Sequence, residues 1–234
     1  MRKRTIVAVS LVTAAAVILA GGLLASNMGF KLNYPLRAAS GTSASGSNTI
    51  ALPYNRQVGI DTAQALFVDI SAAGTAQNLQ KFLPATDTFQ IYTFGSPDFG
   101  LAQGEGYFVK MQNDADYIVV GSHDPSAAIQ LNAAGGGSIS GSNFFAPPYH
   151  TTAATAQDLF LEIATAQNLQ KFLPATDTFQ LYTYGSADFG LAQGEGYFAK
   201  MGTDADYIIV GSHDPSAAIQ LNAAGAGSIS GSNF

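Results

Sequence analysis

TAQNLQKFLPATDTFQIYTFGSPDFGLAQGEGYFVKMQNDADYIVVGSHDPSAAIQLNAAGGGSISGSNF fills residues 75–144, and residues 165–234 repeat this stretch at a constant offset of 90. Of the 70 paired positions 62 are identical, and the eight differences are mild. A period of 90 residues is too long for one turn of a solenoid, so each copy should be a small domain with its own core. The repeat therefore predicts two tandem domains in this chain of 234 residues.

Composition narrows the chemistry and the partners. The chain has no cysteine, which excludes disulfides, thiolate metal sites and covalently attached haem. Sixteen acidic residues stand against ten basic ones, and three of the ten lie in the first four residues. An acidic chain with so few cations is a poor ligand for the phosphate backbone, so we expect no nucleic-acid partner.

The first 25 residues resemble a secretory signal peptide. A basic start, MRKR, precedes an uncharged apolar run that ends in small residues. We expect a secreted, extracellular or cell-surface protein whose contact with the membrane is limited to this segment. The run is long enough to span a bilayer, so an uncleaved N-terminal anchor stays open as an alternative.

Residues 26–47 are predicted to form an amphipathic strand followed by a flexible Ser/Gly linker. Apolar and polar residues alternate over residues 30–36, and Pro35 assigns that strand to the edge of a sheet. A tethered strand of this kind either packs on its own domain or adds to the sheet of another molecule. The apolar residues proposed for such assembly are Phe30, Leu32, Tyr34 and Leu36.

The two repeat domains are predicted at residues 48–142 and 143–234, the second ending on the first residues of a third copy. The fold class is mainly β (α+β): a small antiparallel domain, arranged as a meander, with one short helix in each copy. Residues 62–70 and 155–163 have the helical pattern, and Thr155 and Asp158 suit its N-terminus. Residues 79–94 predict a hairpin that turns at PATD. The Gly/Ser stretches 135–142 and 225–232 are predicted hinges.

Several motifs that suggest chemistry have simpler explanations. Ser122, His123 and Asp124 contain the residue types of a hydrolase triad, but neighbours on a strand point to opposite faces and cannot converge. The QGEGYF stretch is predicted to be a tight turn with Glu105 exposed at its tip. No cofactor is expected, although loop carboxylates in each copy could gather around Ca²⁺. These candidates are Asp98, Asp114, Asp116 and Asp124, with Asp188, Asp204, Asp206 and Asp214 in the second copy.

TAQDLFLEI (155–163), FLPATDTFQLYTY (172–184) and FGLAQGEGYF (189–198) together resemble a tandem β-rich repeat module of secreted and cell-surface bacterial proteins. Modules of that kind carry a T-A-x-D-L helix, an A-T-x-T-F-x-x-Y hairpin and a G-x-G-Y-F strand. The resemblance covers almost everything after Ser45, implies a shared scaffold and brings no catalytic residues.

Two functions from different classes follow from these observations. The first is a secreted structural or assembly protein, a filament or surface-layer subunit that polymerises head to tail by N-terminal strand addition. The second is an extracellular glycan- or surface-binding module, assisted by calcium. Catalysis is not expected, because no converging acid–base pair can be identified in the sequence.

Overall fold

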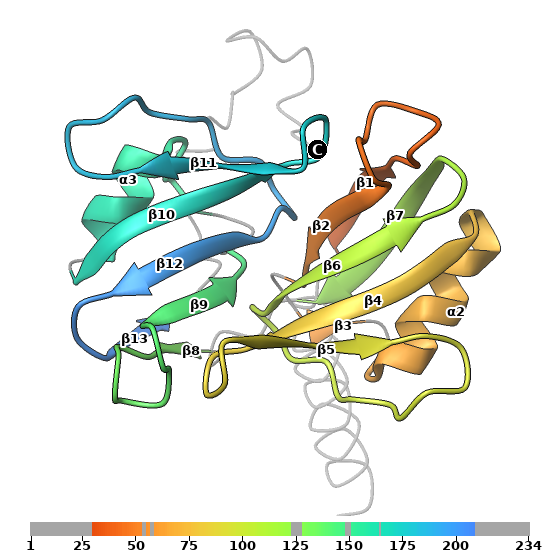
Figure 1. The fold of residues 1–234 in the computed structure, drawn as a ribbon, viewed down its shortest axis with the longest axis horizontal. Helices are drawn as coiled ribbons and strands as arrows, with labels where there is room; N and C mark the ends of the chain where they lie inside the picture. The colour runs from red at the N-terminus through yellow and green to blue at the C-terminus, as the bar shows by residue number, and fades with distance from the viewer. Residues whose placement is uncertain are drawn as a thin grey trace, which may run out of the picture.

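The computed structural model describes residues 30–52, 55–56, 59–122, 128–147, 151–163 and 165–208. The predicted signal segment, His123, Asp124 and Asp214 lie outside these ranges. Within them the chain is mainly β and folds into two similar units, each with one helix, as the repeat predicts (Figure 1). Among the described residues, no helix has the length and apolar character needed to cross a membrane.

The first unit combines a three-stranded sheet, in the order β1-β7-β3, with a four-stranded sheet, in the order β2-β6-β4-β5. Every pairing is antiparallel. Its elements are β1 (Phe30–Leu36), β2 (Ser47–Ala51), β3 (Asn55–Arg56), α2 (Ala63–Ala73), β4 (Ala76–Leu83), β5 (Thr88–Tyr92), β6 (Gly106–Met111) and β7 (Ala115–Ser122).

The second unit repeats this plan with shorter elements. Its sheets are β13-β8 and β11-β10-β12-β9, again antiparallel throughout. Its elements are β8 (Ala128–Leu131), β9 (Ser142–Phe145), α3 (Ala156–Glu162), β10 (Ala166–Leu173), β11 (Thr178–Tyr182), β12 (Tyr197–Met201) and β13 (Ala205–Ile208).

Local sequence accounts for these elements. Thr155 caps α3 by accepting from the Asp158 amide, and the Asp158 carboxylate accepts from the Thr155 amide in return, a capping box. In the β4–β5 hairpin Asp87 adopts φ 51°, a left-handed conformation that Asp tolerates better than most residues. The predicted hairpin and both helices are confirmed.

The predicted meander is wrong. Within each four-stranded sheet only the hairpin partners β4–β5 and β10–β11 are neighbours both in sequence and in space. β6 lies between β2 and β4, although β3, the helix and the hairpin separate it from β2 in the chain, and β5 separates it from β4. The long connection after β5 allows this crossover, because it carries the chain back across the unit before β6 begins.

The boundary between the units also differs from the prediction. β8, predicted to close the first domain, pairs with β13 of the second, and Leu131 and Ala133 lie in the second core. β8 is the counterpart of β1, which pairs with β7 in the same way. The second unit therefore begins with a strand that the sequence analysis assigned to the end of the first, and β1 opens the first unit in the same way.

One side of each four-stranded sheet packs on its helix to form a core. In the first unit Leu66 and Ile70 of α2 pack with Leu79, Tyr92 and β7 residues. In the second unit Leu159 takes the corresponding place beside Leu169 and Tyr182. The other side of each sheet carries a row of phenylalanines, and Figure 1 shows the two sheets lying next to each other with the helices at their outer sides.

Candidate functional site

The described carboxylates proposed to bind calcium do not come together. Asp98 Oδ1 accepts from the Gln64 and Phe99 amides at 2.8 and 2.9 Å, at the start of α2. Asp188 Oδ1 does the same at α3, accepting from Gln157 and Phe189 at 3.0 and 2.8 Å. Over the described part of the chain, no three His, Asp or Glu residues group as metal ligands would. These carboxylates hold loops in place individually.

Asp114 and Asp204 have a different structural role. Asp114 Oδ1 accepts from the Ala38 amide at 2.7 Å, and Asp204 Oδ1 accepts from the Ala133 amide at the same distance. Asp116 forms an ion pair with Arg37 at 3.3 Å, whereas Asp206 is exposed. The predicted metal ligands therefore fasten the loops that follow β1 and β8.

The strand proposed for assembly pairs within its own unit. All seven residues of β1 are in register with β7, from Phe30 opposite Gly121 to Leu36 opposite Ala115. Leu32, Tyr34 and Leu36 are buried in the first core. Of the two alternatives for this amphipathic strand, the structure has the intramolecular one, at the edge of a sheet as Pro35 predicts.

The sequence predicts that Glu105 is exposed at the tip of a turn. In the structure it belongs to a small polar network, and each unit has its own copy of this network. Glu105 Oε2 accepts from Lys81 Nζ at 2.8 Å and from the Tyr107 hydroxyl at 2.6 Å. Glu195 is bound in the same way by Lys171 at 2.8 Å and Tyr197 at 2.7 Å. Burial, and then the Glu195 charge, raise the pKa of Tyr197 far above its usual value. The tyrosine therefore stays a hydrogen-bond donor that holds the loop against the sheet.

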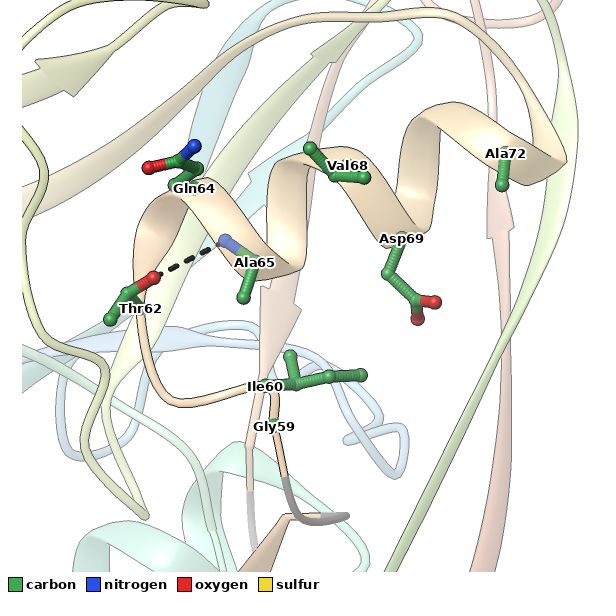
Figure 2. A pocket seen from close by; sticks show the side chains of 8 residues that line it. All are labelled: Gly59, Ile60, Thr62, Gln64, Ala65, Val68, Asp69 and Ala72. Atoms are coloured by element: carbon green, nitrogen blue, oxygen red, sulfur yellow. Dashed lines mark hydrogen bonds between the residues drawn. The ribbon is translucent and has the colours of Figure 1, made fainter.

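A shallow pocket lies along α2 in the first unit, and Figure 2 shows its lining. Most of its lining is apolar or small, including Ile60, Ala65 and Val68. Asp69 is its charged group, and the Asp69 carboxylate accepts from the Tyr117 hydroxyl at 2.7 Å. The pocket thus presents an apolar strip with one carboxylate that is already engaged in a hydrogen bond.

The two Ser/Gly stretches predicted to be a flexible linker and a hinge are ordered loops. We call residues 39–46 and 134–141 the clasp loops. Ser43 Oγ accepts from the Gly46 amide and donates to the Ser47 carbonyl, and Ser138 makes the same two bonds in the second unit. Both serines are buried. The polar composition that suggested flexibility instead supplies the hydrogen bonds that fix each loop.

A buried asparagine closes each clasp loop. Asn48 accepts from the Arg37 amide at 2.8 Å and donates to the carbonyls of Arg37 and Gly46, both at 2.8 Å. Asn143 makes the corresponding three bonds to Asn132 and Gly141, at 2.9 Å each. The side-chain amide imitates the backbone of a neighbouring strand, so the loop ends are held as in a sheet.

The clasp loops join the two units through reciprocal contacts. The Ala44 amide of the first unit donates to the Pro174 carbonyl of the second at 2.7 Å. The equivalent Ile139 amide of the second unit donates to the Pro84 carbonyl of the first at 2.9 Å. Each loop thus binds the PATD turn of the other unit, residues 84–87 or 174–177. This is the pattern of a twofold interface, formed here within one chain.

Side chains repeat the same reciprocity. Ser45 Oγ donates to Asp177 Oδ1 at 2.9 Å, and Ser140 Oγ donates to Asp87 Oδ1 at 2.9 Å. Both aspartates have positive φ, 51° and 52°, so the turn presents its carboxylate in a conformation that few residues adopt. The serines therefore recognise a specific turn.

Phenylalanines fill the space between the units. The Phe82 and Phe198 rings lie 5.1 Å apart, and the equivalent Phe172 and Phe108 rings also lie 5.1 Å apart, both pairs edge to face. Ring centroids at this distance are in direct attractive contact. We call the whole set the Phe cluster, and its members are Phe82, Phe89, Phe108, Phe144, Phe172, Phe179 and Phe198.

Phe144 lies at the centre of the Phe cluster, and the equivalent residue of the first unit is not a phenylalanine but Thr49. The Phe144 ring stacks on Phe108 at 5.0 Å and on Phe198 at 4.4 Å. A Cβ added to Gly106 or Gly196 would come within 3.0 or 2.8 Å of the same ring, so glycine leaves the room that the ring needs. Phe144 therefore contacts both members of two equivalent residue pairs, which places it on the pseudo-twofold axis.

The sequence analysis missed this interface although its signal was present. Ser43–Asn48 and Ser138–Asn143 both read S-x-S-G-S-N, the pattern that returns at residues 228–233. The residues that precede the first two copies differ, so a motif kept in both of them indicates a fixed structure. No known protein family, curated protein or solved structure matches this chain.

Proposed function

We propose that this protein is an exported structural protein whose units are built to associate, a subunit of an extracellular or cell-surface assembly. The observation that carries the proposal is the reciprocal interface. Equivalent loops, turns and phenylalanine rings of the two units are used here to recognise another copy of the same unit.

The composition supports an assembly role in a second way. Net charge is −6 with few charged residues, and several large apolar side chains stay exposed on the sheets. A monomeric protein seldom leaves a contiguous patch of such side chains in water. The proposal keeps the self-association and the surface location expected from the sequence.

The mode of association needs a change from N-terminal strand addition. Release of β1 would separate seven residue pairs between β1 and β7 and expose Leu32, Tyr34 and Leu36, which are buried in the first core. Each such side chain contributes about 1.5–3 kcal/mol by burial, so β1 is better suited to completing its own unit. The contact between molecules therefore belongs elsewhere on the surface.

Two measurements test the proposal. Expression of the whole chain in a bacterium with a secretion pathway should place it outside the cytoplasm, and mass spectrometry should find a new N-terminus near residue 26. Sedimentation velocity on the exported protein should show mass that grows with concentration. A cytoplasmic protein that stays monomeric at all concentrations would disprove the assembly role.

A surface-binding role is the second candidate, and one observation favours it. Phe94 and Tyr184 occupy equivalent positions and are 80% and 74% exposed. Aromatic rings held outward at matched positions are typical of platforms that stack on sugars. A Phe94→Ala/Tyr184→Ala variant should lose binding to insoluble polysaccharide if this role is correct, and should retain self-association.

A further inference from the structure

The edge strands differ in how well they are protected: β5 and β11 lie at edges of the four-stranded sheets, and β1 lies at an edge of the three-stranded sheet. β5 ends one sheet and β11 ends the other, and Figure 1 places these strands at opposite margins of the molecule. Their sequences, TFQIY and TFQLY, contain neither charge nor proline. By contrast the edge strand β1 carries Lys31 and Pro35, the residue types that usually discourage pairing with a second chain.

The side chains on β5 and β11 match this exposed backbone. Phe89 and Ile91 are 40% and 51% exposed, and the equivalent Phe179 and Leu181 are 45% and 52% exposed. They lie on the sheet side that faces away from the helix, since Tyr92 and Tyr182 point into the cores. Each edge therefore offers unpaired strand backbone flanked by an apolar stripe.

These stripes continue an interface that the protein already forms. Phe89 contacts Phe82 and Phe108 at 5.3 and 5.6 Å, and Phe179 contacts Phe172 and Phe198 at 5.4 and 5.6 Å. The Phe cluster between the units thus extends outward onto both edges. A strand of the same sequence, brought alongside, would add its own Phe to a cluster of phenylalanine rings and its Ile or Leu to the exposed apolar stripe beside it.

We propose that β5 and β11 are the surfaces through which copies of this chain join, edge strand to edge strand, so that the sheets of neighbouring molecules become continuous. The inference rests on the assembly function proposed above and names its contact. The occupant is a second copy, because an extended uncharged strand with alternating large apolar residues is what each edge matches. The same edge of another copy supplies such a strand, so that β5 pairs with β5 and β11 with β11, antiparallel about a twofold axis. With two edges per molecule the contact does not close and generates a fibre.

Lysine substitutions in the full chain test this arrangement. Ile91→Lys places charge on one edge only, so growth should stop at two copies joined through β11. Ile91→Lys with Leu181→Lys should stay at one copy at concentrations where the parent forms large species. Val68→Lys with Leu161→Lys adds the same two charges at exposed apolar positions of the helices, 52% and 59% exposed, and should assemble like the parent.

A second double variant with smaller changes tests the same contact with less risk that the protein misfolds. Ile91→Thr with Leu181→Thr places threonine, a residue that favours strands, at both positions, and should raise the concentration needed for assembly by about tenfold or more through lost apolar burial. Circular dichroism and Tm should match the parent for every variant. Assembly of the double lysine variant at the parent's concentration would overturn this inference and leave the proposed function standing. A parent that never assembles would overturn both.

Discussion

The two units are near-copies, yet the first carries Thr49 where the second carries Phe144. Thr49 pairs with Phe108 in one sheet, and Phe144 pairs with Phe198 in the other, so the two positions are equivalent. On a twofold axis there is space for one ring, and a symmetric pair would require either two rings or none. The comparison shows how the difference between Thr49 and Phe144 lets two otherwise similar sheet faces pack against each other.

The largest expected effect comes from erasing that difference. Phe144→Thr removes a buried ring stacked on both neighbours, and we expect a loss of about 3 kcal/mol in the free energy of unfolding. Urea denaturation measures it, with the exposed Phe94→Thr as the control that should change little.

The reverse exchange sharpens the result. Thr49→Phe alone should destabilise by about 1–3 kcal/mol, because a second ring overfills the axis. Thr49→Phe combined with Phe144→Thr should recover part of the loss, since one ring is again present. Strict additivity of the two single changes would contradict the shared position on the axis.

The clasp loops give a comparison in which the units should behave alike. Asn48→Ala and Asn143→Ala each remove three hydrogen bonds from a buried site and leave backbone groups unpaired. We expect about 2 kcal/mol of destabilisation for each, measured by thermal and urea unfolding. Clearly unequal losses would show that one clasp contributes more than its equivalent.

The two helices differ in their N-terminal capping, and the residues responsible can be exchanged between them by mutation. α3 has Asp158 at its third position, where α2 has Ala65. Ala65→Asp should complete a capping box in the first unit and stabilise it by about 0.5–1 kcal/mol, and Asp158→Ala should cost a similar amount. Amide hydrogen exchange in the first turn of each helix separates the two effects.

A smaller effect is expected on acidification. Burial alone would raise the pKa of Asp98, but hydrogen bonds from Gln64, Thr62, Phe99 and Ala63 outweigh it and lower the pKa below 3.8. A lowered pKa stabilises the fold above the ordinary value, and this contribution is lost as pH falls through the lowered one. The advantage of the parent over Asp98→Asn should therefore shrink below about pH 4. Parallel Tm profiles would contradict this.

The smallest expected effect concerns calcium. Asp98 and Asp114 already accept backbone amides at separate places, so we expect neither Ca²⁺ nor a chelator to shift the Tm of the exported protein. Differential scanning calorimetry with and without each reagent measures this. A rise in Tm with Ca²⁺ would restore the metal hypothesis and direct attention to Asp124 and Asp214.

The sequence predicts the elements that depend on neighbouring residues, but it misses the contacts between strands and units that are distant in the chain. The 3.6-residue pattern and Thr155 locate a helix, and PATD between aromatic arms locates a hairpin, because these signals act within a few residues. The positions of β6 and β8 depend on which strands meet in space, which short-range patterns do not encode. The clasp serines were misjudged because their polar composition is the same in a mobile linker and in a bonded loop.

Among the described residues, the candidate metal ligands lie apart for a related reason. Spacing placed Asp98 and Asp114 in loops, correctly, whereas Asp116 lies in strand β7. A carboxylate in a loop is as useful for binding a backbone amide as for binding an ion. Only the fold shows which amide each one faces. The Phe cluster likewise required knowledge of the second sheet, since Phe82 and Phe108 look like ordinary core residues of their own unit.

Each clasp loop binds the PATD turn of the other unit, so two units together use all of these contacts. Near-identical copies 90 residues apart invite out-of-register recombination, which inserts or deletes whole units in the gene. One added unit brings a clasp loop and a PATD turn that have no partner, whereas two added units can bind each other's loops and turns. Descendants of such a gene should therefore keep an even number of units, and selection can act on whether that number is even or odd.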